Sequence, residues 1–223
     1  MDGGGDSRVV VLTGGRGDLA RACADAFAAR GWRVLAPGRD ELDVTSAASV
    51  GAFFARIERI DALVNNAGVT GDALLARMDD AAWDRVVATN LTGAFLCSRA
   101  VVRPMSRRHR GHLIHVGSWS GLRGNAGQAN YAAAKAGLIG LSASLAKEYG
   151  GRSIQSNVVL PGFLETRMTA RLPAAARERA LADHALGRFN TAASAAEFIA
   201  FLAGMELVSG QVFQLDSRVG RWA

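Results

Sequence analysis

The sequence predicts an α/β fold in which a doubly wound parallel sheet carries helices on both faces. Short apolar runs alternate with segments of helical periodicity along the whole chain of 223 residues, which is the order typical of such sheets. Glycine is abundant, with 26 residues, and only 7% of the residues are aromatic. This composition suits helices packed closely on a sheet better than a β-sandwich.

The expected elements follow from these runs and from the glycine and proline residues that bound them. Strands are predicted at residues 8–12, 32–36, 61–65, 113–116, 154–160 and 211–215, and helices at residues 19–31, 47–60, 78–103 (one or two helices), 130–149 and 192–203. Too few residues separate the second strand from Glu41 for a crossover helix, so the sheet edge near residues 37–46 should be abbreviated. We expect a disordered tail at residues 1–7 and one Rossmann-like domain at residues 8–223.

Charge and composition exclude several classes of function. The net charge of +6 suggests an acidic partner, but no basic block is interleaved with aromatic residues, so we expect no nucleic acid. No apolar run has membrane-spanning length and the N-terminus lacks a signal-peptide core, which predicts a cytoplasmic protein with no membrane partner. Cys23 and Cys97 lie in predicted helices, and His109, His112 and His115 have no carboxylate near them in sequence. Neither a disulfide nor a metal site is expected.

A glycine-rich loop, TGGRGDLA at residues 13–20, follows the first strand. Glycines let backbone amides and a helix N-terminus approach a pyrophosphate, so this loop is a candidate dinucleotide site, although Asp18 would repel a phosphate if its carboxylate pointed inward. NAD-binding folds usually place an acid at the end of the second strand, where this chain has Pro-Gly-Arg at residues 37–39. Arg39, with Arg16, can pair with a 2′-phosphate, which favours NADPH over NADH. The alternative is that Arg39 is an ordinary surface-loop arginine.

Tyr131 and Lys135 lie four residues apart in a segment that reads as helix, so both side chains should leave the same face. A nearby ammonium lowers the pKa of a phenol from about 10, which would make Tyr131 a proton donor and acceptor near neutral pH. Ser118 follows the strand at residues 113–116 and is expected beside Tyr131, where its hydroxyl can hold a substrate oxygen. A tyrosine and a lysine at this spacing also occur on solvated helix faces, so the rest of the chain has to decide.

Further motifs stand at the ends of the predicted strands. Together with the glycine loop they cover nearly the whole chain: Thr13-Gly14, Asp43-Val44, Asn65-Asn66-Ala67-Gly68, Asn90, Ser118 thirteen residues before Tyr131, Lys135, and Pro161-Gly162. This set resembles the short-chain dehydrogenases/reductases. Within that family, GQANYAAAKAGLIG and NNAGVTGDALLARM are most similar to the 3-ketoacyl-[acyl carrier protein] reductases of bacterial fatty-acid and polyketide synthesis.

The resemblance implies a catalytic tetrad. Tyr131 would protonate the substrate carbonyl, Ser118 would polarise it, Lys135 would bind the nicotinamide ribose, and Asn90 would hold a water that relays protons, while the nicotinamide supplies a hydride. With the two arginines included, the expected cofactor-binding residues are Gly14, Arg16, Gly17, Leu19, Arg39, Asp43, Val44, Asn66, Ala67, Gly68, Tyr131, Lys135, Pro161, Gly162, Leu164 and Thr166. The resemblance also implies a homo-oligomer, a tetramer or a dimer, with the helices around residues 90–103 and 131–149 at one interface.

The chain departs from the family pattern at two places. Its glycine loop is one residue tighter than T-G-x-x-x-G-x-G and is closer to the spacing of extended members such as the dTDP-4-dehydrorhamnose reductases. The residues after the last strand, 216–222 (DSRVGRW), lack the Gly-Gly pair that is usual there. Different subunit packing is expected at this second place.

Two further features bear on the substrate and the partner. A basic cluster, Arg103, Arg107, Arg108 and Arg110, stands at the end of a predicted helix and is a candidate docking surface for an acidic acyl carrier protein. The alternative is that these arginines complement the helix dipole. Trp119, directly after Ser118, should shape the substrate pocket with residues 164–168, and its bulk suggests a preference for flat or unsaturated acyl chains.

These features favour an NADPH-dependent reductase that converts a carrier-bound 3-ketoacyl thioester to the 3-hydroxyacyl thioester. One alternative is a reductase or dehydrogenase of the same family that acts on a free small-molecule ketone or alcohol. Another, motivated by the altered loop with Asp18, is a catalytically silent cofactor-binding partner subunit.

Overall fold

The sheet of the computed structural model has six parallel strands among the residues that the structure describes, which are 7–166, 169–170 and 174–219. The strands are β1 (Val9–Leu12), β2 (Arg33–Leu35), β3 (Ala62–Asn65), β4 (Gly111–Val116), β5 (Ile154–Leu160) and β6 (Val212–Gln214). Their spatial order is β2-β1-β3-β4-β5-β6. This is the predicted doubly wound, Rossmann-like sheet.

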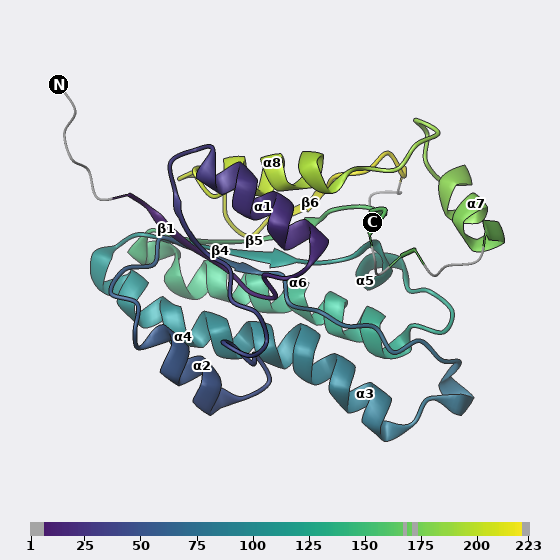
Figure 1. Cartoon of the computed structure of the whole chain (residues 1–223), viewed down its shortest axis with the longest axis horizontal. Helices are drawn as coiled ribbons and strands as arrows, with labels where there is room; N and C mark the ends of the chain where they lie inside the picture. Colours follow the sequence, from purple (N-terminus) through teal and green to yellow (C-terminus); the bar gives the residue numbers. More distant parts are fainter. Residues whose placement is uncertain (1–6, 167–168, 171–173, 220–223) are drawn as a thin grey trace.

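Helices connect the strands and cover both faces of the sheet. They are α1 (Asp18–Ala28), α2 (Ala47–Phe54), α3 (Asp80–Val87), α4 (Gly93–Arg108), α5 (Trp119–Arg123), α6 (Ala129–Tyr149), α7 (Ala174–Ala182) and α8 (Ala192–Leu202). In Figure 1, α1 and α8 lie on one face, and α2, α4 and α6 lie on the other. Within the described ranges, none of these helices combines the length and the apolar character that a membrane span requires.

Alternation of side chains along each strand builds two apolar cores, one on each face of the sheet. In β1, Val10 and Leu12 belong to the core formed with α1 and α8, whereas Val11 belongs to the core formed with α2 and α4. Every residue of β1 and β3 is buried, as expected of central parallel strands that are covered on both faces.

The sheet edge at β2 is abbreviated, as the sequence predicted. β2 has three residues, and residues 36–46 after it form neither helix nor strand. The next helix, α2, begins only after Ser46, whose side chain caps it by accepting a hydrogen bond from the Ser49 amide. The chain then passes over to β3, on the other side of β1 from β2.

Some elements differ from the prediction. The helical region predicted at residues 78–103 consists of α3 and α4 joined by a turn of π-helix, Ala88–Thr92, and α4 continues to Arg108. Helices α5 and α7 were not predicted, although the sequence of α7, AAARERALA, consists of strong helix formers. The predicted disordered tail falls on residues 1–6, outside the described residues, and Ser7. The single-domain boundary stays a prediction.

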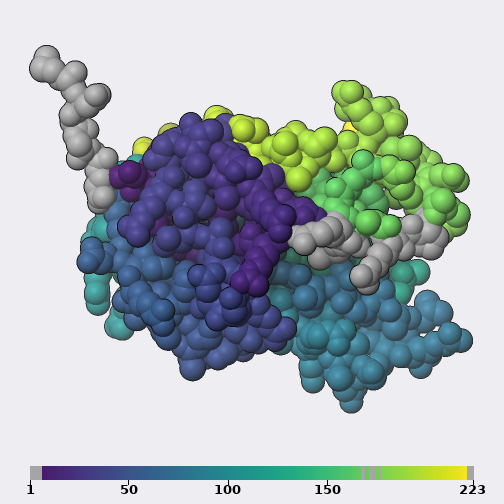
Figure 2. All heavy atoms as spheres, in the orientation of Figure 1, coloured from purple at the N-terminus to yellow at the C-terminus, as the bar shows by residue number. Residues whose placement is uncertain are grey.

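The carboxyl ends of the parallel strands meet at one edge of the sheet, where such folds bind their ligands. At this end of the molecule, α7 and the region around α3 both protrude, as Figure 2 shows in green and in blue to teal. Residues from both protruding regions line the cavity that opens between them.

Candidate active site

A cavity of about 980 Å³ lies at the carboxyl ends of the strands. The predicted site residues that line it are Gly14, Gly17, Leu19, Arg39, Asp43, Val44, Asn66, Ala67, Gly68, Ser118, Tyr131, Lys135, Pro161, Gly162, Leu164 and Thr166. Arg16 and Asn90 are not among the residues that line it. The fold therefore brings motifs that lie up to 152 residues apart in the sequence, from Gly14 to Thr166, together around one cavity.

Hydrogen bonds to Thr13 tie the glycine loop to the end of β3. Its Oγ1 accepts from the amides of Asn66 and Ala67, each at 3.0 Å, and Asn66 Nδ2 donates to the Thr13 carbonyl at 3.0 Å. Gly14 has a φ of +68°, and a Cβ there would lie 2.9 Å from the Cα of Ala67, so both conformation and space require glycine. Gly17 caps α1 and has no side chain to bond its first amides. A loop of this shape fits the pyrophosphate of a dinucleotide.

Arg16 and Arg39, predicted to bind a 2′-phosphate, are each paired with a carboxylate. The guanidinium of Arg16 lies 2.7 Å from Asp40, and that of Arg39 lies 3.5 Å from Asp43. Hydrogen bonds from Thr45, and to a smaller extent Arg39, lower the pKa of Asp43, so this carboxyl is ionised. Because Arg39 lines the cavity and Arg16 does not, Arg39 is the better placed of the two for a phosphate.

Ser118, Tyr131 and Lys135 converge at the end of β4. Ser118 caps α5, its Oγ accepting from the Ser120 amide at 3.2 Å, and a hydrogen bond joins its side chain to Tyr131. One turn further along α6, Lys135 Nζ donates to the Val116 carbonyl at 2.7 Å and lies 5.6 Å from the centre of the Tyr131 ring. A hydroxyl, a phenol and an ammonium thus share one wall of the cavity.

The pKa of Tyr131 is raised, so the predicted lowering by Lys135 is wrong for the protein alone. Burial has the largest effect because it disfavours the phenolate, the hydrogen bond from Ser118 acts in the opposite direction, and Asp72 raises the pKa further. Burial also lowers the pKa of Lys135 to about 8. Near neutral pH the site therefore holds a protonated phenol beside an ammonium. A proton donor has to carry its proton, and the phenol does so at this pH.

Asn90 lies behind this wall, in the π-helical turn between α3 and α4, and is buried. Its Nδ2 donates to the carbonyls of Val69 and Val86, at 2.8 and 2.9 Å. Its Oδ1 has no hydrogen-bond partner among the described residues, and a Cβ on Gly68 would lie 2.7 Å from it. π-Turns inside helices are frequent at functional sites, and an amide oxygen with a free acceptor position fits a water-holding role.

A polar network at the cavity rim was not predicted. Gln128 Oε1 accepts from Ser120 Oγ at 2.9 Å and from Asn125 Nδ2 at 3.1 Å, and Gln128 Nε2 donates to Asp72 Oδ2 at 2.9 Å. All four residues line the cavity. Gln128 stands three residues before Tyr131, so the motif GQANY carried a signal for it, whereas the contact with Asp72 spans 56 positions and has none.

His112 and His115 are buried on β4, where both bond neighbouring side chains of the sheet. His115 contacts Asn65 Nδ2 at 3.3 Å and Ser156 Oγ at 3.4 Å, and His112 contacts Asn157 Nδ2 at 2.9 Å. Burial lowers the pKa of His112 to about 4 and that of His115 to about 3, so both rings are neutral. In the described part of the chain no cluster of three or more potential metal-binding side chains occurs.

The basic cluster of Arg103, Arg107, Arg108 and Arg110 lies at the far end of the sheet. Arg103, Arg107 and Arg108 lie in the second half of α4, and Arg110 lies between α4 and β4. The cluster therefore precedes the first residue of β4, whereas Ser118 follows the last residue of that strand. Arg108 bonds the Ile60 carbonyl and lies 3.9 Å from Asp61, so it is partly engaged inside the protein. The other three arginines are exposed.

A protonated phenol beside an ammonium and a glycine loop is the arrangement expected in a nicotinamide-dependent oxidoreductase that acts on CH–OH and C=O groups. The family model described as short chain dehydrogenase matches residues 40–177, which is more than half of the chain. The chain belongs to this family.

Curated relatives extend the similarity to nearly the full length. The chain is 41% identical over 235 residues to the 3-oxoacyl-[acyl-carrier-protein] reductase FabG of Escherichia coli (strain K12), covering 95% of this chain and 96% of that protein. It is 40% identical over 238 residues to the protein of the same name from Thermotoga maritima, covering 95% and 97%. With the Pseudomonas aeruginosa protein it shares 47% identity over 175 residues, covering 76% and 71%.

Proposed function

We propose that this protein uses NADPH to reduce a 3-ketoacyl thioester, carried by an acyl carrier protein, to the 3-hydroxyacyl thioester in fatty-acid or polyketide-type synthesis. The observation that carries the proposal is the convergence of Ser118, Tyr131 and Lys135 on a cavity that also contains the glycine loop. The names of the curated relatives support the substrate class.

The roles of the three side chains follow from their protonation states. When bound, the nicotinamide supplies a hydride to the carbonyl carbon. Ser118 donates a hydrogen bond to the carbonyl oxygen and orients it, and Tyr131 transfers its phenolic proton to that oxygen. A raised pKa suits this direction, since the phenol is protonated at neutral pH. The Lys135 ammonium stabilises the phenolate that remains and binds the ribose hydroxyls.

Asn90 supports return of the proton to Tyr131 from solvent. Its two N–H bonds to backbone carbonyls fix the amide, and its buried Oδ1 can accept a hydrogen bond from a water next to Gly68. Buried acceptors are nearly always satisfied, which is why we assign a water to this position.

The choice of NADPH as cofactor rests on which charged residues lie near the expected position of the adenosine ribose. Gly14 and Gly17 would hold the pyrophosphate, Asp43 and Val44 the adenine, and residues 161–166 the nicotinamide. Arg39 lines the cavity beside Asp43, and no acid stands at residues 36–38 to accept ribose hydroxyls. These features favour NADPH over NADH.

The basic cluster is the proposed docking surface for the acidic carrier. Because it lies at the opposite end of β4 from Ser118, docking there is productive only in an oligomer in which the cluster of one subunit lies near the cavity of another. A tetramer or dimer is therefore part of the proposal, and so is a cytoplasmic location.

The test compares three substrates that carry the same keto group: acetoacetyl-[acyl carrier protein], acetoacetyl-CoA and ethyl acetoacetate. The rate of NADPH oxidation, followed by absorbance at 340 nm, should be highest with the carrier-bound thioester when the three substrates are compared at equal concentration. Preference for the free ester would favour a small-molecule reductase, and failure to bind or oxidise NADPH would favour a silent partner subunit.

Charge reversal then tests the docking surface. Arg103→Glu with Arg107→Glu should raise KM for the carrier substrate by about tenfold and leave acetoacetyl-CoA turnover unchanged. Arg108 stays intact because it bonds Ile60. Arg33→Glu, an exposed arginine on β2, is the matched control and should change neither substrate.

A further inference from the structure

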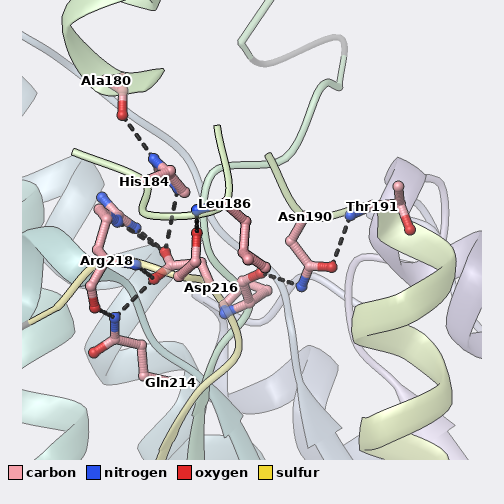
Figure 3. Close-up of polar contacts among 10 residues, drawn as sticks. Ala180, His184, Leu186, Asn190, Thr191, Gln214, Asp216 and Arg218 are labelled. Carbon is pink, nitrogen blue, oxygen red and sulfur yellow. Dashed lines mark hydrogen bonds and ion pairs between the residues drawn. The ribbon is translucent and has the colours of Figure 1, made fainter. Parts of the chain in front are cut away.

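The segment that follows β6 folds back against the cavity and contains a buried ion pair. Arg218 Nε donates to Asp216 Oδ2 at 2.8 Å, and a second guanidinium nitrogen bonds the same oxygen. Gln214 Nε2 donates to Asp216 Oδ1 at 2.7 Å and to the Arg218 carbonyl at 2.6 Å. The Asp216 side chain is 1% exposed and that of Arg218 is 12% exposed. Figure 3 shows these three residues gathered around the carboxylate.

The charge on Asp216 is fixed by these contacts. Burial alone would raise its pKa, but the hydrogen bonds from Arg218 and Gln214 outweigh burial and leave the pKa below its usual range. Buried ion pairs add little net stability, since desolvation offsets the attraction. What the pair does supply is one fixed orientation of the Arg218 guanidinium, because that group can satisfy the carboxylate in few ways.

The oriented guanidinium lies over the indole of Trp119. Its central carbon is 4.5 Å from the ring centre, within the range of a cation–π contact. Trp119 directly follows Ser118, the residue proposed to orient the substrate carbonyl, and both Trp119 and Arg218 line the cavity. The stack therefore borders the space left for the substrate.

The same segment also holds the region after α7. The amide of Ala185 donates to the Ser217 carbonyl at 3.1 Å, and His184 and Arg218 form an antiparallel bridge. His184 Nδ1 lies 2.7 Å from the Ala180 carbonyl, and its Nε2 lies 3.8 Å from Asp216 Oδ2. Both ring nitrogens thus face oxygen atoms, as Figure 3 shows, and the histidine packs α7 onto the ion pair.

The backbone after β5 is shaped around Asp216 as well. Gly162 has a φ of +87°, and a Cβ there would lie 2.7 Å from the Cβ of Asp216. Because Pro161 and Gly162 line the cavity, Asp216 packs against backbone that forms part of the cavity wall.

We propose that Arg218 is a substrate-positioning residue of this enzyme. Held by Asp216, it fixes the Trp119 indole as one wall of the pocket for the acyl thioester, next to Ser118. It acts through Trp119 and takes no part in proton transfer. The inference rests on the proposed function for the identity of the substrate, but the contact between Arg218 and Trp119 can be tested without turnover.

The kinetic test uses NADPH and acetoacetyl-CoA. Arg218→Met keeps the length of the side chain and removes its charge, and it should raise KM for the thioester about fivefold while kcat and KM for NADPH stay within twofold of wild type. Arg218→Lys should recover part of the loss. Since Arg218→Met leaves Asp216 unpaired, the double variant Asp216→Asn/Arg218→Met removes both charges and should show the same KM.

The matched control is a second arginine–tryptophan contact far from the cavity. The guanidinium carbon of Arg8 lies 4.3 Å from the centre of the Trp32 ring, at the start of β1. Arg8→Met should change neither KM. A loss of kcat with unchanged KM in the double variant would show that Arg218 is only structural, and would overturn the proposal.

A spectroscopic test does not depend on activity. Indole N–H resonances in a ¹H–¹⁵N correlation spectrum are assigned with Trp119→Phe and Trp32→Phe. The double variant should shift the Trp119 signal, Arg8→Met should shift the Trp32 signal, and acetoacetyl-CoA added to the wild-type NADPH complex should move Trp119 alone. If wild type oxidises no NADPH with thioesters, the proposed function fails and these spectra decide the inference by themselves. An unmoved Trp119 signal would overturn it.

Discussion

The cavity has two halves, one proposed to bind the cofactor and one proposed to bind the substrate, and they are built in different ways. The cofactor half consists largely of backbone: the glycine loop, the amides after β3, and the turn after β5, each placed by a motif of a few consecutive residues. The substrate half consists of side chains that meet from distant segments, such as Gln128 with Asp72 and Arg218 with Trp119. Backbone geometry fixes the first half locally, whereas the second half exists only once the chain has folded.

This difference has a functional consequence. A substitution in the cofactor half should change NADPH binding, and one in the substrate half should change the KM of the thioester. Residues at the boundary, above all Tyr131, should affect the chemical step itself. The predictions below test this division, beginning with the largest effect.

Tyr131→Phe should lower kcat for reduction about a thousandfold, since it removes the proton donor and leaves the ring in place. Binding of NADPH, measured by fluorescence titration, should stay unchanged. Tyr149→Phe substitutes the other tyrosine of the chain, at the end of α6, and should leave kcat as it is. A loss of less than tenfold in Tyr131→Phe would show that another group donates the proton.

Gly14→Ala should weaken NADPH binding by at least about tenfold, because the new Cβ would push against Ala67 beside the cavity. Gly31→Ala is the matched control, since Gly31 has a φ of +74° but no atom within 4 Å of the added Cβ. Both variants should lose thermal stability from backbone strain, by about 1 kcal/mol in Gly31→Ala and by more in Gly14→Ala, where the contact with Ala67 adds to the strain. Only Gly14→Ala should lose affinity, and equal affinities would contradict the close approach.

The rate of reduction should fall at alkaline pH. Lys135 has a pKa of about 8, so it is charged below that pH and neutral above it. If the ammonium is required, kcat/KM should decline about tenfold between roughly pH 7 and 9. Tyr131 has a raised pKa and does not titrate in this interval, and His112 and His115 are already neutral. A flat profile to about pH 9.5 would exclude a role for the charge of Lys135.

Arg39→Gln should raise KM for NADPH several-fold and leave KM for NADH unchanged. The effect should be small and should shrink at high salt, because the Arg39 side chain is 85% exposed and Asp43 competes for it. Arg16→Gln, which alters an arginine that does not line the cavity, should have the smaller effect of the two. The opposite ranking would move the phosphate site to Arg16.

Much of the fold could be predicted because its signals are local. Apolar runs located the six strands of the described residues, and the short distance between Ala36 and Glu41 predicted the abbreviated edge. The Tyr131–Lys135 spacing placed both side chains at the cavity, since helical geometry converts that spacing into a shared face.

The remaining features depend on burial or on long-range contacts. The pKa of Tyr131 is set mainly by how deeply the folded chain buries it, which neighbouring residues in sequence do not reveal. The π-turn at Asn90 leaves a helical sequence pattern almost unchanged. The sequence showed that the Gly-Gly pair after β6 is missing. It did not show that an ion pair stacked on Trp119 stands there, because this contact joins residues about 100 positions apart.

The short edge strands limit pairing between the sheets of different molecules. β2 and β6, at the two sides of the sheet, have three residues each, so either edge offers few backbone groups to a strand of another molecule. Short edges are one means by which proteins avoid strand-to-strand aggregation. Subunits of this chain should consequently associate through helical faces and loops, and the sheet should end within each subunit.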